Sequence, residues 1–184
     1  MPRHILIRNV LLAATLITGV CAAKSNTPVL TTDDAISQRA VHEVRMYPRY
    51  SLFDNVEIQV SNGALHLTGE VTQPYKKSDL GHIMGRIAGV TAVDNDLKVA
   101  PPLPFDDQLR SQVARTLFHD PVLARYEDQP IPAIHIIVDH GHVSLEGVVR
   151  TIQDKELAGI RANQNMGFGN ATNNLRVEIA NPHS

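Results

Sequence analysis

Apolar and polar residues alternate in two stretches of the chain, residues 56–71 and 134–149, which lie 78 positions apart. In each stretch the alternation has a period of two and is interrupted by a short polar segment that contains a glycine, Gly63 or Gly141. This pattern predicts a β-hairpin whose glycine occupies a turn position with positive φ. Because the same spacing recurs beyond the hairpins, the sequence indicates two copies of one fold.

Apolar residues at a spacing of four precede each hairpin, which predicts an amphipathic helix at that place. They are Ile36, Ala40 and Val44 in the first copy and Leu109, Val113 and Leu117 in the second. A second helix (residues 75–88 and 152–166) and a final strand (residues 92–99 and 172–179) complete each copy, and the second helix of the later copy is less apolar. The sequence therefore predicts an α+β fold of two tandem two-layer α/β sandwiches, each with the order helix, strand, strand, helix, strand.

Two further pairs of glycines recur at the same offset of 78 residues. Gly69 and Gly147 stand where an inward side chain is expected in the second strand of each hairpin, which predicts that a helix crosses closely there. Gly89 and Gly167 follow the second helix of each copy. We expect all of these glycines to serve turns and packing.

The ends of the chain and the connection between the copies have their own patterns. Arg3 and Arg8 precede a short apolar run that ends in small residues, which is typical of a secretory signal peptide over residues 1–23. An uncleaved membrane anchor and a lipoprotein modified at Cys21 are the alternatives. Residues 24–32 are expected to be a tether, residues 101–104 a proline-rich linker and residues 181–184 a tail.

The charge of the chain limits its partners. The net charge is −2, from 17 basic and 19 acidic residues. Loss of residues 1–23 would remove two arginines and leave the mature chain more acidic. An acidic chain without basic clusters argues against nucleic-acid binding. Cys21 is the only cysteine of the chain, so the mature chain would contain none and no disulfide is expected.

The histidines suggest a metal site only at the second hairpin. His135, His140 and His142 cluster around its turn beside Asp139. The corresponding positions of the first copy hold Glu57, Asn62 and Ala64, and no further ligands stand at a recognisable spacing. The sequence also lacks a nucleophile elbow. We therefore expect no metal, no cofactor and no catalysis, with a metal-dependent enzyme at this histidine-rich hairpin as an alternative.

Each copy resembles the BON domain. The resemblance rests on the hairpin with a glycine at its turn, the inner glycine six residues later, and Gly89-Val90 followed by the segment 93–97. It covers residues 33–100 and 105–180, and the pair is similar to double-BON proteins of the Gram-negative envelope, which include an osmotically inducible periplasmic protein and an outer-membrane lipoprotein. The resemblance implies a non-catalytic periplasmic protein that binds anionic phospholipid surfaces or envelope proteins in envelope integrity and osmotic stress. A stress-induced periplasmic chaperone is the alternative.

Two surfaces of the second copy are candidates for binding. Arg110 and Phe118 are expected on one side of the first helix of this copy, with Arg115 close by. These three residues are predicted to face lipid, because anionic headgroups attract cations. Ile137 and Val148 are apolar where the first copy is polar, so they are predicted to meet a partner, the other copy or a covering loop. A competing basic patch of the first copy consists of Lys76, Lys77 and Arg86. The sequence leaves the oligomeric state open.

Overall fold

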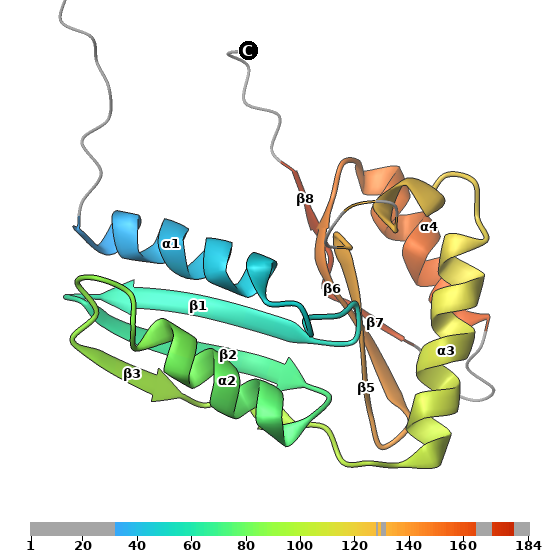
Figure 1. Cartoon of the computed structure of the whole chain (residues 1–184). Coiled ribbons are helices and arrows are strands. Elements are labelled where there is room, and N and C mark those ends of the chain that lie inside the picture. The colour runs from blue at the N-terminus through green and yellow to red at the C-terminus, as the bar shows by residue number, and fades with distance from the viewer. Residues whose placement is uncertain (1–31, 128, 130–131, 165–170, 179–184) are drawn as a thin grey trace, which may run out of the picture.

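The computed structural model describes residues 32–127, 129, 132–164 and 171–178, which form two α+β units in tandem (Figure 1). The predicted signal peptide with Cys21, most of the tether, Gly167 and the tail lie outside the described residues. Within the described part, no helix is long and apolar enough to span a membrane.

Both units have the predicted order of elements. The first unit comprises α1 (Thr32–Met46), β1 (Asn55–Ser61), β2 (Ala64–Val71), α2 (Pro74–Met84), β3 (Ala92–Asn95) and β4 (Lys98–Val99). The second comprises α3 (Pro104–Phe118), the 3-10 helix η1 (Ala124–Tyr126), β5 (Ile134–Asp139), β6 (His142–Val149), α4 (Ile152–Asn163), β7 (Thr172–Asn173) and β8 (Arg176–Val177). Each predicted final strand is divided in two, and both second helices end earlier than predicted.

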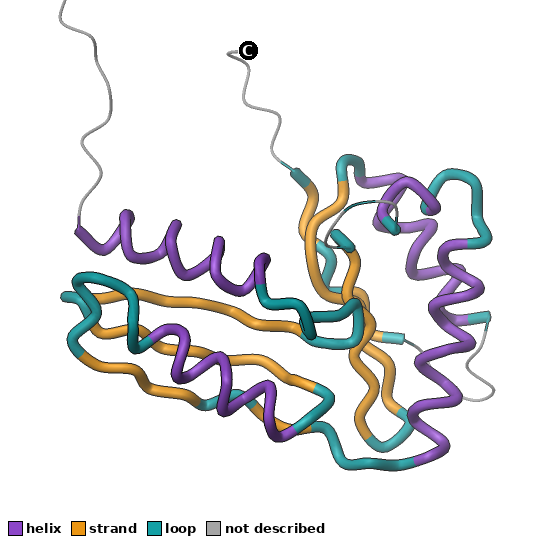
Figure 2. The backbone as a smooth tube through the Cα atoms, viewed as in Figure 1, coloured by secondary structure: helices purple, strands orange, loops and turns teal. Residues whose placement is uncertain are grey.

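The hairpin strand β2 lies at the centre of the first sheet. It pairs antiparallel with β1 and parallel with β3 and β4, and β6 has the same relation to β5, β7 and β8. The helices of each unit cover one face of its sheet (Figure 2). The predicted helical stripes are buried there, which confirms the helix phases: Ile36, Ala40, Val44, Leu109, Val113 and Leu117.

An aspartate at the start of the first helix holds the hairpin turn in each unit. The Asp33 carboxylate accepts hydrogen bonds from the backbone N–H groups of Asn62 at 2.8 Å and Gly63 at 2.9 Å. In the second unit Asp106 accepts those of His140 and Gly141 at 2.9 and 2.8 Å. Both residues of each turn have positive φ, as a type I′ turn requires, which confirms the predicted role of the turn glycines.

Gly69 and Gly147 accommodate the neighbouring strand, so the predicted helix crossing at these positions was wrong. Gly69 has φ of +108°, and an added Cβ would lie 2.3 Å from the carbonyl oxygen of Asn55. Gly147 has φ of +116° and meets the backbone of Ala133 in the same way. The positive φ turns the Cα toward the start of the partner strand, where only glycine fits.

The close approach of a helix occurs instead at glycines within the helices. A Cβ on Gly81 in α2 would lie 2.7 Å from Nδ2 of Asn95, which donates a hydrogen bond to the Lys77 carbonyl. Gly159 in α4 lies against Asn173 in the same way. Each asparagine thus joins the third strand of its unit, β3 or β7, to the second helix.

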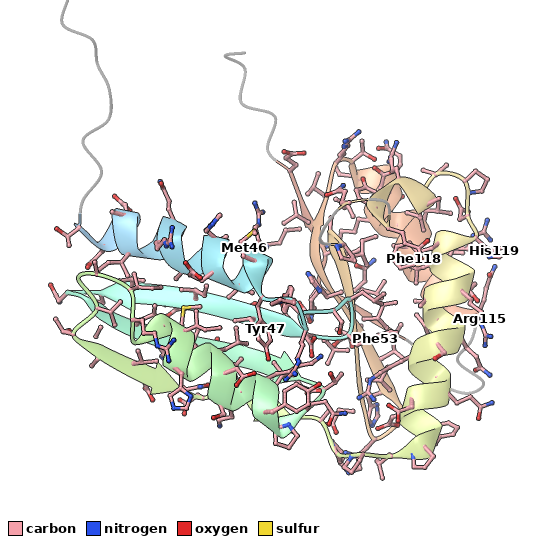
Figure 3. The ribbon with its side chains drawn as sticks, in the orientation of Figure 1. Met46, Tyr47, Phe53, Arg115, Phe118 and His119 are labelled. Carbon is pink, nitrogen blue, oxygen red and sulfur yellow. The ribbon has the colours of Figure 1, made fainter. Side chains whose placement is uncertain are left out.

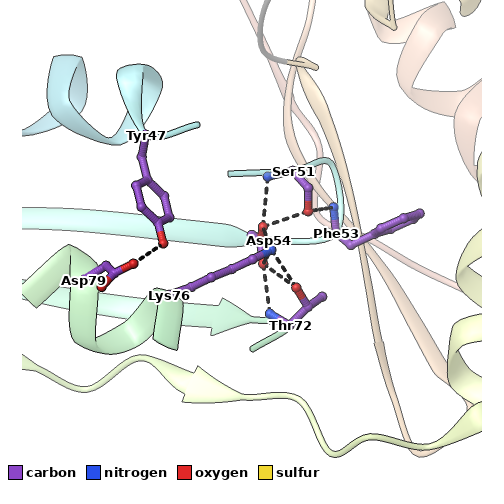
Figure 4. Close-up of polar contacts among 7 residues, drawn as sticks. All are labelled: Tyr47, Ser51, Phe53, Asp54, Thr72, Lys76 and Asp79. Carbon is purple, nitrogen blue, oxygen red and sulfur yellow. Dashed lines mark hydrogen bonds and ion pairs between the residues drawn. The ribbon is translucent and has the colours of Figure 1, made fainter. Parts of the chain in front are cut away.

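A buried ion pair fixes the loop between α1 and β1 (Figure 4). Asp54 is fully buried, and Nζ of Lys76 lies 2.7 Å from its Oδ2. Its carboxylate also accepts hydrogen bonds from the backbone N–H groups of Ser51 and Thr72, each at 2.8 Å. Burial alone would raise the pKa of Asp54, but these donors and the lysine lower it below 3.8.

The loop that Asp54 fixes contacts the second unit. Leu52 and Phe53 pack against the apolar core of that unit. The carbonyl oxygen of Leu52 accepts a hydrogen bond of 2.8 Å from the N–H of Ile136, so the loop covers part of the free edge of β5. The ring of Tyr50 lies 5.4 Å from that of His135. This loop therefore joins the two units.

We expect Gly69→Ala to destabilise the protein strongly, because alanine is strained at this φ and its Cβ would overlap the Asn55 carbonyl. Gly85→Ala is the matched control: Gly85 has φ of −66° and the nearest atom to an added Cβ lies at 3.6 Å. The control should be neutral or more stable by about 0.4–1 kcal/mol. Urea unfolding measures both, and equal stabilities would contradict the assignment.

Lys76→Met should lower the free energy of unfolding by roughly 3–5 kcal/mol, because it leaves the Asp54 charge buried without its partner. Glu43→Gln, which breaks the exposed pair between Arg39 and Glu43, should cost only about 0.3–0.5 kcal/mol. The Asp54 pair should stabilise the fold above pH ~4 and lose this effect as the pH falls through the lowered pKa of Asp54. Urea unfolding at several pH values tests both statements.

Candidate ligand-binding surface

Arg110 is buried, so its predicted position on a lipid-facing patch was wrong. Its side chain is 4% exposed and lies between α3 and the second hairpin. Nη2 donates a hydrogen bond to the Val138 carbonyl at 2.5 Å, and Nη1 donates one to Asp107 at 2.7 Å. The guanidinium thus donates a hydrogen bond to a backbone carbonyl near the end of the Ile134–Asp139 strand and does not face solvent.

Phe118 also belongs to the core of the second unit, with 8% of its surface exposed. Helix α3 packs against both β5 and α4, so it buries a wider stripe than its spacing-four pattern indicated. Arg115 alone of the predicted set is exposed, and Figure 3 shows it on the outer side of α3, away from Phe118. The structure therefore does not assemble these three residues into one surface.

The two residues of the predicted partner surface differ in exposure. Ile137 is 8% exposed, and Val148 is 39% exposed. Ile137 shares the outer face of β5 with His135, whose ring contacts Tyr50 of the first unit. The first unit thus covers this face of β5 at His135, and Val148 is exposed.

The histidines of the second hairpin do not form a metal centre within the described residues. Nδ1 of His140 lies 2.5 Å from the Asp139 carboxylate, both at the exposed turn. His135 is at the other end of the strand, buried against the first unit. The three histidines therefore do not converge on one point.

The described residues contain one group with metal-ligating atoms close together, on the outer face of the first sheet. His66 Nε2 lies 3.2 Å from Asp96 Oδ2 and 3.9 Å from Asp94 Oδ2. All three side chains are well exposed, and a surface hydrogen bond between His66 and Asp96 accounts for their arrangement.

A groove lies between α1 and the end of α2 in the first unit. It has a volume of about 650 Å³. Its apolar lining comes from Ile36, Ile83 and Ile87, while Arg39 and Arg86 supply positive charge. Arg39 also pairs with Glu43 across one helical turn at 2.6 Å. The groove therefore combines an apolar floor with two cations, of which Arg39 is paired with Glu43 in the same lining.

The competing basic patch named from the sequence contributes only Arg86 to this groove. Lys76 is 5% exposed and bound to Asp54, and Lys77 is not among the lining residues. Arg39 was missed because it lies in α1, and the hairpin and α2 separate it from Arg86 in the sequence. The signal that could have found it is the spacing of Ile36 and Arg39, which places a cation beside the apolar stripe.

The second unit has different side chains at the positions that line this groove. Arg161 replaces Ile83 and forms an ion pair of 2.8 Å with Asp120. Glutamines 112 and 164 replace Arg39 and Arg86. The two cations are thus a property of the first unit.

The comparisons with known proteins identify the domain type. The sequence matches the BON domain over residues 32–101 and 105–178. No curated protein matches the chain.

Among solved structures, the chain is similar to CdsD, a structural protein of the type III secretion system of Chlamydia trachomatis. The identity is 17% and the TM-score 0.30, over 78% of this chain and 61% of that one. A structure of the CdsD C-terminal domain gives 17% and 0.28, over 75% and 64%. The chain thus spans less than two thirds of these structures.

Arg110→Ala should destabilise the protein by about 1.5–3 kcal/mol, because it removes charge-assisted hydrogen bonds to a buried carbonyl. Arg115→Ala on the exposed side of the same helix should change the stability by no more than about 0.5 kcal/mol. Thermal unfolding of both variants is the measurement. Equal stability of the two would place Arg110 at the surface after all.

Proposed function

Because the chain belongs to the BON domain family over most of its length, we propose that it binds anionic phospholipid surfaces of the cell envelope through the groove of the first unit. BON domains are non-enzymatic, occur in periplasmic and envelope proteins and are associated with phospholipid binding. The family thus supports the class of ligand. The particular site is our proposal.

The observation that supports this site most is the placement of Arg39 and Arg86 beside an apolar floor. A phospholipid surface offers phosphate groups next to acyl chains, so a binding site needs cations next to apolar side chains. Ile83 is partly exposed between the two helices and supplies apolar contact at the groove. The phosphate groups would therefore contact the arginines, and the acyl chains would contact the apolar side chains of the groove.

The electrostatics indicate weak and reversible binding. The whole chain carries a net charge of −2, so long-range attraction to an anionic surface is absent and only local cations contribute. Each cation near such a surface is worth about 1 kcal/mol. Arg39 contributes less than Arg86, since Glu43 already pairs with it.

The proposed cellular setting is the periplasm, reached through the signal peptide expected at residues 1–23. There the protein would meet the inner leaflet of an outer membrane or the outer leaflet of an inner one. A role in envelope integrity under osmotic stress fits this location. The alternative partner, an envelope protein, is an outcome of the test below.

Arg39→Gln combined with Arg86→Gln should weaken co-flotation with vesicles that contain phosphatidylglycerol. Two cations at about 1 kcal/mol each predict a loss of up to roughly 30-fold in partitioning. Binding of the unmodified chain should weaken as salt is added, because ions screen these charges.

Arg115→Gln combined with Arg176→Gln is the matched control, since it removes the same charge from exposed sites of the second unit. The control should float as the unmodified chain does. Absence of flotation at low salt would overturn lipid binding and leave a protein partner. Equal losses in both double variants would overturn the groove as the site.

A further inference from the structure

The contact between the two units contains a titratable side chain that the proposed lipid site does not use. His135 lies on the outer face of β5 and is 8% exposed. Its counterpart in the first unit, Glu57, is exposed on β1. The histidine is therefore buried by the contact between the units, since its own unit would leave that face open.

The surroundings of His135 suit a neutral ring. Its Nδ1 is buried and has no hydrogen-bond partner among the described residues. The ring packs against Tyr50 at 5.4 Å between centroids, with an interplanar angle of 52°. A protonated ring would place a charge in a contact that is otherwise formed by an aromatic side chain and the apolar residues Leu52 and Phe53.

The titratable groups that face His135 offer little compensation for a charge on its ring. From the first unit these are Tyr50 and Asp54, and the Asp54 charge is already neutralised by Lys76 at 2.7 Å. From its own sheet, Glu146 stands opposite in register, and its carboxylate accepts a hydrogen bond of 2.7 Å from Asn174. Burial lowers the pKa of His135 below 6.5 and outweighs the opposing effects of the Ser51 backbone, the Asp54 charge and the Asp54 backbone.

We propose that the contact between the two units is acid-sensitive, and that protonation of His135 releases the 50–54 loop from β5 while each unit stays folded. At neutral pH the ring is uncharged whether or not the units are in contact, so it does not oppose the contact. As the pH falls below about 6.5, separated units take up a proton more readily than joined ones. Separation is therefore favoured on the acid side of this value.

Another interface group titrates with the opposite sign. Burial raises the pKa of Glu70, and the charge of Asp139 in the second unit raises it further. Protonation of Glu70 removes this repulsion and strengthens the contact, which is the opposite of the effect of His135 protonation. The two protonations therefore act on the contact in opposite directions, and the His135 variants described below separate their effects.

The test measures the distance between the units in the full chain. Spin labels are attached at His82→Cys on α2 and His119→Cys after α3, both exposed positions, in a Cys21→Ser background. At about pH 7.5 we expect one narrow distance distribution. At about pH 5.5 a second component should appear, with a population that grows by up to about tenfold per pH unit because one proton is taken up.

His135→Phe should keep the narrow distribution at both pH values, because it retains a ring against Tyr50 and cannot be protonated. His135→Gln serves the same purpose if the larger ring disturbs folding. His140→Gln is the matched control at an exposed histidine and should behave as the unmodified chain does. The proposal is overturned if the second component persists in both His135 variants, if it never appears, or if circular dichroism shows that the units unfold with it.

Discussion

The buried ion pair between Asp54 and Lys76 is the constraint on which the arrangement of the two units depends. A carboxylate without solvent contact must be neutralised and hydrogen-bonded, and here α2, the end of β2 and the loop itself all supply donors. These donors hold the loop in one conformation. The same loop presents the Leu52 carbonyl and the Phe53 ring to β5, so a charge pair inside the first unit determines how the second is held.

The second unit meets the same structural requirement with different chemical groups. Asp154 takes the place of Lys76 in the helix, and Tyr126 from η1 donates a hydrogen bond of 2.7 Å to it. The Tyr126 hydroxyl in turn accepts the backbone N–H of Arg150 at 2.8 Å, just as the first-unit aspartate accepts that of Thr72. The duplication therefore preserved a joint between loop, strand and helix while the chemical groups that form it changed.

Features that depend on local sequence patterns were predictable from the sequence, whereas features that depend on distant contacts were not. Alternation, turn glycines and helical stripes are local patterns, and each copy of the repeat contains them independently. The predicted elements and the predicted turn at Gly63 were therefore correct. The burial of Arg110 and His135 depends on elements distant in the sequence, and no local pattern carries that information. Ile137 was an intermediate case: its difference from the first copy marked a covered face but did not show what covers it.

The asymmetry between the copies also changes where binding is expected. The sequence differences are concentrated in the second copy, which favoured that copy as the functional one. In the structure, several of these differences are engaged within the protein: His135 is buried against the first unit, Ile137 is buried on the same face of β5, and Arg161 pairs with Asp120 of its own unit. A unit whose distinctive side chains are engaged in this way has fewer of them free for a ligand. The first unit keeps two arginines beside an apolar groove, and this difference supports its assignment as the lipid-binding half.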